Sequence, residues 1–213
     1  MAPDTLVPFK WLGKKENAVA RNPVFDGGLD LEDNSIEKYI GIDQSYSGFA
    51  ITIINKDCTL YKTFVYTSPL RGVERLRDIA LYIGQHVFEP VTNVQGSAIE
   101  GYAYGAQMAH MAGEIGALVK LELRSWLYET EARYPFIVAP AMLKKYVTGK
   151  GQGVKKNQIL LNVFKKWGIE FTDDNAADSY ALARIAAGRA DTAYEKEVIK
   201  KLLDPKYREN PLL

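Results

Sequence analysis

The sequence predicts an α/β fold in which helices cover both faces of a mixed sheet. Three observations support this prediction. Short β-rich segments are grouped early in the chain, later ones alternate with amphipathic helical patterns, and several carboxylates stand at the ends of apolar runs. Strands and helices in this order bury their apolar faces as stacked layers. A chain of 213 residues suits one domain with additions.

The first half of the chain predicts three antiparallel strands. Within residues 39–54 the segments YIGID and GFAITII flank a polar turn, and CTLYKTFVYT offers the third strand. Such runs separated by short turns are typical of a meander. Residues 1–36 are rich in charge and turn formers, so we expect an N-terminal extension before a domain over 37–190 and a C-terminal tail over 191–213.

The rest of the chain predicts two more strands and five helices. Apolar residues recur at steps of three and four over 73–87, which predicts an amphipathic helix that ends before Pro90. SAIE and PFIVAP are the remaining strands, separated by a helical pattern over 106–131. The last three helices are expected over 141–147, over 154–167 and from near Asn175.

The composition excludes several classes of protein. A single cysteine, Cys58, leaves no internal disulfide and no cysteine-based zinc site. No apolar stretch reaches the roughly 18 residues of a membrane span, and the N-terminus lacks the apolar block of a secretory signal. We therefore expect a soluble cytoplasmic protein with no membrane partner. The net charge of +1 means that any nucleic-acid binding depends on local charge.

Three acidic residues follow or begin apolar segments: Asp43 in YIGIDQ, Glu100 in SAIEG, and Asp178 in NAADSYALA. An unpaired buried carboxylate costs several kcal/mol, so such placement indicates a use for concentrated negative charge. Carboxylates hold Mg²⁺, and two such ions about 4 Å apart support attack on a phosphodiester. The sequence therefore predicts a metal-dependent nuclease.

Each acidic residue also has a structural interpretation. Asp43 could cap a turn, Glu100 could be an exposed edge residue, and Asn175 could cap a helix with Asp178 at its third position. Asp174 and Asn175 precede Asp178 by four and three residues, so either could be a fourth ligand.

The only charged residues between Pro140 and Trp167 are lysines: Lys144, Lys145, Lys150, Lys155, Lys156, Lys165 and Lys166. Lys144 and Lys155 flank the glycine-rich segment TGKGQG, where ammonium and backbone N–H groups can meet phosphates. The alternative is a solvated face. Tyr102 and Tyr104 follow Glu100 and could either stack on DNA bases or pack in the core.

Four segments together resemble the RuvC family of Holliday-junction resolvases. They are GIDQSYSGFAITI, AIEGYAYG, VAPAMLKKYVTGKGQGVKKNQI and NAADSYALARIAAG, in family order between residues 39 and 190. The resemblance implies an RNase H-like (RuvC-like) mixed five-stranded sheet, a homodimer, Mg²⁺ or Mn²⁺ dependence with two ions per active site, and paired nicks across a four-way junction. It also places Lys144 and Lys155 on the two family lysines.

The chain departs from the family pattern in three places. Asn175 stands where the family often has aspartate, Ala103 replaces the family's base-stacking aromatic, and the two terminal additions have no family counterpart. The additions suggest a phage-type or divergent member, in a bacterial cytoplasm or a phage-infected cell.

The predicted activity is that of a homodimeric Mg²⁺-dependent endonuclease of branched DNA, acting on four-way junctions and also forks or flaps. The expected metal ligands are Asp43, Glu100, Asp178 and either Asp174 or Asn175, with Lys155 as an additional catalytic residue. The expected DNA contacts are Lys144, Lys145, Lys150, Lys155, Lys156, Tyr102 and Tyr104. The alternatives are a non-catalytic branched-DNA-binding protein and an actin-like ATPase, which would need two such domains.

Overall fold

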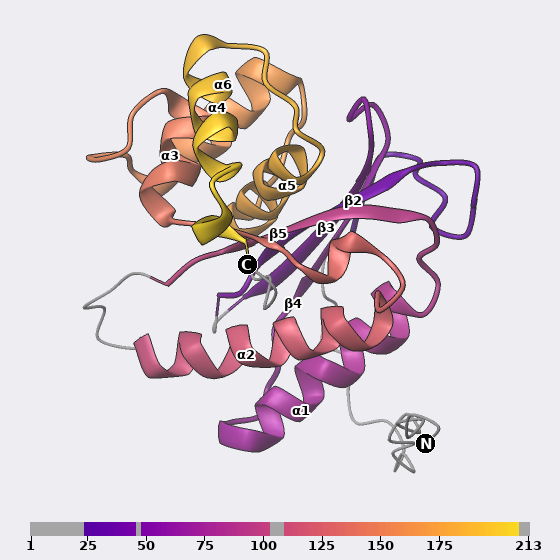
Figure 1. Ribbon diagram of the computed structural model, residues 1–213. Helices are drawn as coiled ribbons and strands as arrows, with labels where there is room; N and C mark the ends of the chain where they lie inside the picture. Colours follow the sequence, from indigo (N-terminus) through magenta and orange to yellow (C-terminus); the bar gives the residue numbers. More distant parts are fainter. Residues whose placement is uncertain (1–23, 46–47, 103–108, 209–213) are drawn as a thin grey trace.

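The computed structural model describes residues 24–45, 48–102 and 109–208. Its centre is a six-stranded sheet in the order β1-β4-β3-β2-β5-β6 (Figure 1). The strands are β1 (Val24–Asp26), β2 (Lys38–Asp43), β3 (Phe49–Asn55), β4 (Tyr61–Tyr66), β5 (Val94–Glu100) and β6 (Phe136–Val138).

The sheet is mixed, as the sequence predicts. Strands β2, β3 and β4 are antiparallel neighbours, which confirms the meander. Strands β5 and β6 continue the sheet in parallel with β2. Because β2 and β5 run in the same direction, the residues at their carboxyl ends meet at one edge of the sheet.

The sixth strand corrects the expectation of five strands. Strand β1 pairs antiparallel with β4 and lies within the segment expected to be an extension. The Phe25 ring packs edge-on against Phe171, with ring centroids 5.1 Å apart. Leu29 and Leu31 are buried in an apolar core on one face of the sheet, together with Ile79 and Val119. A three-residue strand bounded by turn formers has too little periodicity to be recognised from sequence.

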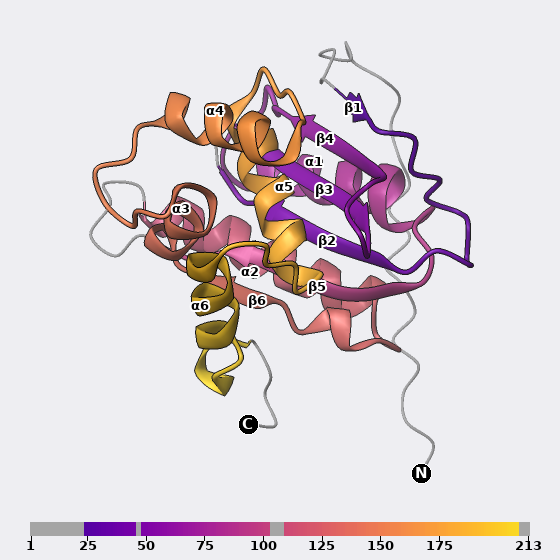
Figure 2. The ribbon, with the colours of Figure 1, turned by 90° about the horizontal axis from the view of Figure 1, so that it is seen from above.

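Helices cover both faces of the sheet (Figures 1 and 2). On one face lie α1 (Gly72–Ile83), which continues into a π-helical turn (Gly84–Phe88), and α2 (Ala109–Trp126). On the other face lie α3 (Pro140–Thr148), α4 (Lys156–Trp167), α5 (Asp174–Ala186) and α6 (Ala193–Leu202). Two buried apolar clusters, one on each side, hold these layers to the sheet. None of the helices in the described ranges is long and apolar enough to cross a membrane.

Helix α5 lies directly on the sheet, across β2, β3 and β5 (Figure 2). Half of its buried residues are alanine, which allows a close approach. The approach is closest at Gly41 of β2, where a Cβ would collide with the backbone of Ser179 and Ala183. A glycine in the middle of β2 therefore sets the position of α5 over the strand ends.

Part of the predicted C-terminal tail is also packed. Val198 and Leu202 of α6 are buried in the same core as α3. Glu195 is fully buried, where it caps the start of α6 and pairs with Lys166 of α4. This buried ion pair ties α6 to α4.

Candidate metal and DNA site

Two of the predicted ligands stand side by side at one edge of the sheet. Asp43 is the last residue of β2, and Glu100 is the last residue of β5. Ile42 pairs with Ile99 in the parallel ladder, so the two carboxylates follow paired positions. Asp43 is only 4% exposed, and its Oδ1 accepts a hydrogen bond from the Ser45 main-chain N–H at 3.1 Å.

The other two carboxylates come from the first two turns of α5. Asp174 is the first residue of this helix, and Asp178 lies four residues later on the same face. The cap of α5 is Asp173, whose carboxylate accepts from the main-chain N–H groups of Asn175 at 2.9 Å and Ala176 at 3.1 Å. The interpretation of Asn175 as the cap is therefore wrong, and Asp178 has no capping role.

The carboxylates act on one another electrostatically. Burial first, and then the charges of Glu100 and Asp178, hold the pKa of Asp43 well above its usual range. Burial also raises the pKa of Glu100 to about 7. The pKa of Asp178 rises to about 7 through burial and through repulsion from Glu100 and Asp174. The charges of Glu100, Asp174 and Asp178 thus make Asp43 harder to ionise, and those of Glu100 and Asp174 do the same for Asp178.

Asn175 points toward a different part of the site. The amide nitrogen of its side chain lies 2.6 Å from where a Cβ of Gly48 would stand. Gly48 closes the turn between β2 and β3, so Asn175 packs over this turn. Asp174 instead contributes its charge to the carboxylate cluster.

The lysines of residues 140–167 differ in their distance from the carboxylates and in their partners. Lys144 and Lys156 lower the pKa values of Glu100 and Asp178, and Lys156 forms an ion pair with Asp174. Lys155 is exposed, and its main-chain N–H donates to Gln158 Oε1 at 2.9 Å as α4 begins. The lysine that pairs with a carboxylate of the cluster is therefore Lys156, while the catalytic role of Lys155 stays a prediction.

The remaining lysines have other partners or face solvent. Lys145 pairs with Glu197 of α6 at 2.6 Å, and Lys150 is exposed in the glycine-rich loop. Lys165 is exposed, whereas Lys166 is largely buried against Glu195 and the carbonyl oxygens of Tyr146 and Val147.

Tyr102 is half-buried and packs against α2. A Cβ at Gly116 would collide with its hydroxyl group, and Lys120 lies 5.8 Å from the centre of its ring. The structure shows Tyr102 packed in this way, and its stacking on DNA bases stays a prediction. Tyr104, the other predicted stacking residue, lies outside the described residues.

Gln44 is a site residue that sequence reasoning missed. Its side-chain amide donates to the main-chain carbonyl of Glu100 at 2.6 Å, which ties the end of β2 to the end of β5. Gln44 is buried, and its Oε1 lies toward Gly116 of α2. A polar residue directly after the strand-ending aspartate was the available signal, but it is also common turn chemistry.

The donor set fits a hard divalent cation. Mg²⁺ prefers oxygen ligands, and positive charge among these carboxylates would offset the burial and the repulsion that raise their pKa values. As the side chains stand, no group of three or more carboxylate, imidazole or thiolate residues in the described ranges is arranged to hold a metal ion. In this arrangement Lys156 supplies positive charge to Asp174.

Comparison with known proteins places the fold. No protein-family model matches the sequence, and no curated protein matches it. A structure of Thermus thermophilus RuvC is similar with a TM-score of 0.51 and 19% identity, covering 68% of this chain and 90% of that one. T. thermophilus RuvC in complex with a Holliday junction substrate gives a TM-score of 0.50 at the same identity and coverage. The chain therefore has the RuvC-like form of the RNase H-like α/β fold.

Proposed function

We propose that this chain is a metal-dependent, structure-selective DNA endonuclease that resolves four-way junctions and cuts other branched DNA. The observation that carries the proposal is the convergence of four carboxylates from β2, β5 and α5 at one edge of the sheet, where their charges raise the pKa values of Asp43 and Asp178. Buried like charges are costly, and such perturbed pKa values are typical of functional sites. The fold adds support, because a RuvC structure was solved with a Holliday junction substrate.

Asp43, Glu100, Asp178 and Asp174 would hold two Mg²⁺ or Mn²⁺ ions. Such ions supply an activated water and stabilise the attacking and leaving oxygens of a phosphodiester. Asp43, the most buried of the four, would anchor the pair from the end of β2. Gln44 would keep the two strand ends at a fixed separation through its bond to the Glu100 carbonyl.

The lysines beside the carboxylates would position the DNA strand. Lys144 and Lys156 come from α3 and α4 and already act on Glu100 and Asp178. An ammonium group beside the metal ligands can contact the phosphate to be cut and offset the negative charge of the transition state. Lys150 and Lys155 lie between Lys144 and Lys156 in the sequence and are exposed. They would contribute phosphate contacts that raise the affinity for DNA.

Resolution of a junction requires cuts on two strands, so we propose that a homodimer supplies two sites. Each site would leave a 5′-phosphate and a 3′-hydroxyl. Light scattering on the purified chain should give twice the monomer mass of 23.9 kDa. A monomer at the concentrations where cleavage occurs would contradict the paired-cut proposal.

The activity is tested with end-labelled four-way junction, fork, flap and linear duplex of equal length, each with Mg²⁺, Mn²⁺ or EDTA. We expect symmetrical nicks in the junction with either metal, little cutting of the linear duplex, and none with EDTA. Ligation of the products would establish the end chemistry. Tight junction binding without nicking in either metal would instead support the non-catalytic alternative.

A further inference from the structure

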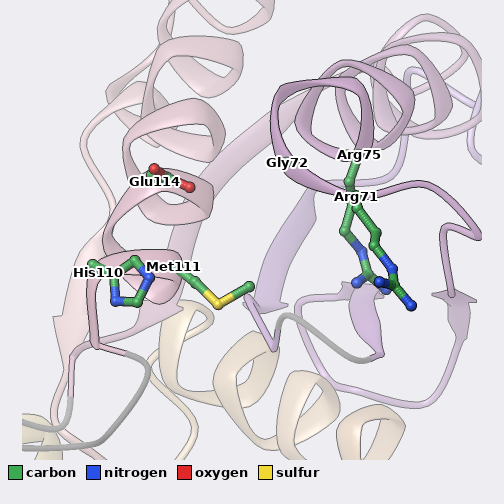
Figure 3. A pocket seen from close by; sticks show the side chains of 6 residues that line it. All are labelled: Arg71, Gly72, Arg75, His110, Met111 and Glu114. Carbon is green, nitrogen blue, oxygen red and sulfur yellow. The ribbon is translucent and has the colours of Figure 1, made fainter.

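A cleft of about 470 Å³ opens between the N-terminal ends of α1 and α2 (Figure 3). It lies on the opposite face of the sheet from α5 and the lysines of α3 and α4 (Figure 1). Its lining residues are Arg71, Gly72, Arg75, His110, Met111 and Glu114. The cleft lies outside the carboxylate site, and none of its residues has a role in the proposed chemistry.

The two arginines give the cleft the chemistry of a phosphate site. Arg71 and Arg75 are four residues apart, and Figure 3 shows their guanidinium groups extending side by side in the same direction. Arg75 Nη2 donates to the Ser68 carbonyl at 3.0 Å, which helps to fix the orientation of this side chain. Paired guanidinium groups offer planar forks of donors that match phosphate oxygens.

The cleft faces the same end of the sheet as the carboxylates. Strand β4 ends at Tyr66, which pairs with Phe49 at the start of β3, and α1 begins shortly afterwards. Helix α2 is the next helix after the Glu100 end of β5. Figure 1 shows the N-terminal ends of both helices on the side toward which the carboxyl end of β5 points. Arg71 and Arg75 thus stand at the same end of the sheet as the carboxylates, in the layer opposite to that of Lys144 and Lys156.

We propose that this cleft binds a backbone phosphate of a second DNA segment, in the arm of the branched substrate that is not being cut. The inference rests on the proposed function and adds a substrate-selecting contact to it. A strand held by Lys144 and Lys156 occupies the α3 and α4 side of the site. Linear duplex follows one path and engages that side, whereas a branched substrate has a further arm to place against Arg71 and Arg75.

The negative charge of Glu114 should weaken phosphate binding in this cleft, which is the opposite of the effect of the arginines. Its carboxylate lies one helical turn beyond His110 on α2 and is exposed (Figure 3). A carboxylate at the wall of the cleft repels a phosphate that binds to the arginines. Removal of its charge should therefore strengthen binding, whereas removal of the Arg71 charge should weaken it.

The test is equilibrium binding of labelled four-way junction and of linear duplex, in EDTA to prevent cutting, over a series of salt concentrations. The variants are Arg71→Ala, Arg71→Glu and Glu114→Gln, and the matched control is Lys200→Ala, an exposed charge on α6. One lost phosphate contact lowers the slope of log affinity against log salt by about 0.9. For the junction we expect Arg71→Ala to show that change with about a fivefold loss of affinity, and Arg71→Glu to lose more.

For linear duplex we expect Arg71→Ala to stay within about twofold of wild type, and Glu114→Gln should bind the junction about twofold more tightly. Arg71 is exposed, so thermal unfolding of its variants should match that of wild type and exclude misfolding. The inference is overturned if Arg71→Ala behaves as Lys200→Ala does on the junction, or if it loses as much affinity for duplex as for junction. If either of these results is found while the wild-type protein still nicks the junction, the inference fails but the proposed function stands. Failure of the wild type to bind the junction overturns both.

Discussion

Lys156, the first residue of α4, forms an ion pair with Asp174, the first residue of α5. The ammonium group is mostly exposed, whereas the carboxylate faces the cluster formed with Asp43 and Asp178. Asp174 also contributes to the raised pKa values of both these residues. The pair therefore sets a cation at the boundary between the carboxylates and the surface where DNA would lie.

Lys156→Ala should slow the chemical step. Its charge acts on the carboxylates, and the loss of one electrostatic contact near the reacting phosphate typically costs about tenfold or more. We expect that loss in single-turnover cleavage at saturating protein. Lys155→Ala, and the exposed control Lys165→Ala, should mainly shift the protein concentration at which cleavage is half-maximal.

The opposite ranking, with Lys155→Ala slow at saturation and Lys156→Ala normal, would return the catalytic role to Lys155. Lys166 is unsuitable as a surface control because it is paired with the buried Glu195. Its removal would strand that carboxylate and destabilise the fold.

Asp174→Asn should be nearly inactive, and Asn175→Ala should be mild. Asp174 supplies charge to the cluster, whereas the Asn175 amide packs over the turn at Gly48. Calorimetric titration with Mn²⁺ should show weaker binding for Asp174→Asn only. Normal metal affinity in Asp174→Asn together with a loss in Asn175→Ala would make the amide the fourth ligand.

The metal-free protein should lose stability as the pH rises. The pKa values of Glu100 and Asp178 are about 7 in the folded chain, above their ordinary values, so folding favours their protonated forms. The contribution of these two carboxyl groups to the free energy of unfolding is complete below pH about 4 and is lost as the pH rises through about 7. Each unit of pKa shift corresponds to about 1.4 kcal/mol, so a fall of roughly 2 kcal/mol or more is expected between pH 5 and 8.

Urea unfolding in EDTA at these two pH values measures that fall. Mg²⁺ should reverse most of it at pH 8, because an ion bound only to the folded state adds stability. Glu100→Gln removes one of the two titrating groups and the charge that raises the pKa of Asp178, so it should reduce the fall. A free energy of unfolding that is constant or rises with pH in EDTA would show that folding does not raise the pKa values of Glu100 and Asp178.

Gly41→Ala should strongly destabilise the fold. Its Cβ would run into the backbone of α5 at Ser179 and Ala183, which cannot move without lifting the helix from β2. Overpacking of this kind costs about 1–3 kcal/mol or more. Gly113→Ala is the matched control, because nothing lies within 4 Å of its Cβ position in α2 and alanine favours a helix by about 0.5–1 kcal/mol. Thermal unfolding should separate the two variants in opposite directions.

The sequence was sufficient for the parts of the fold that have strong periodicity. The β-rich apolar runs of β2 and β3 and the stepwise pattern of α1 predicted elements that the structure contains. The convergence of Asp43 and Glu100 could be predicted because each residue ends a strand. The two strands are parallel neighbours, which places their last residues at one edge of the sheet. The position of Asp178 required the helix to cross that edge, which Gly41 makes possible.

Other features depend on contacts that a linear pattern does not contain. Strand β1 is fixed by pairing with β4 and by the packing of Phe25 on Phe171. Lys155 and Lys156 are adjacent in the chain, so only the path of α4 decides which ammonium group meets Asp174. The arginine cleft joins residues of α1 and α2 that no sequence spacing relates.

The most direct test of the account is cleavage of a labelled four-way junction by Asp43→Asn beside wild type and Glu89→Gln, an exposed carboxylate directly after the π-helical turn. We expect wild type and Glu89→Gln to nick the junction in Mg²⁺ at equal rates. Asp43→Asn should lose at least about a thousandfold in rate while binding the junction as tightly or more tightly, since a negative charge is gone. Nicking by Asp43→Asn at more than a tenth of the wild-type rate would remove this residue from the active site and contradict the account.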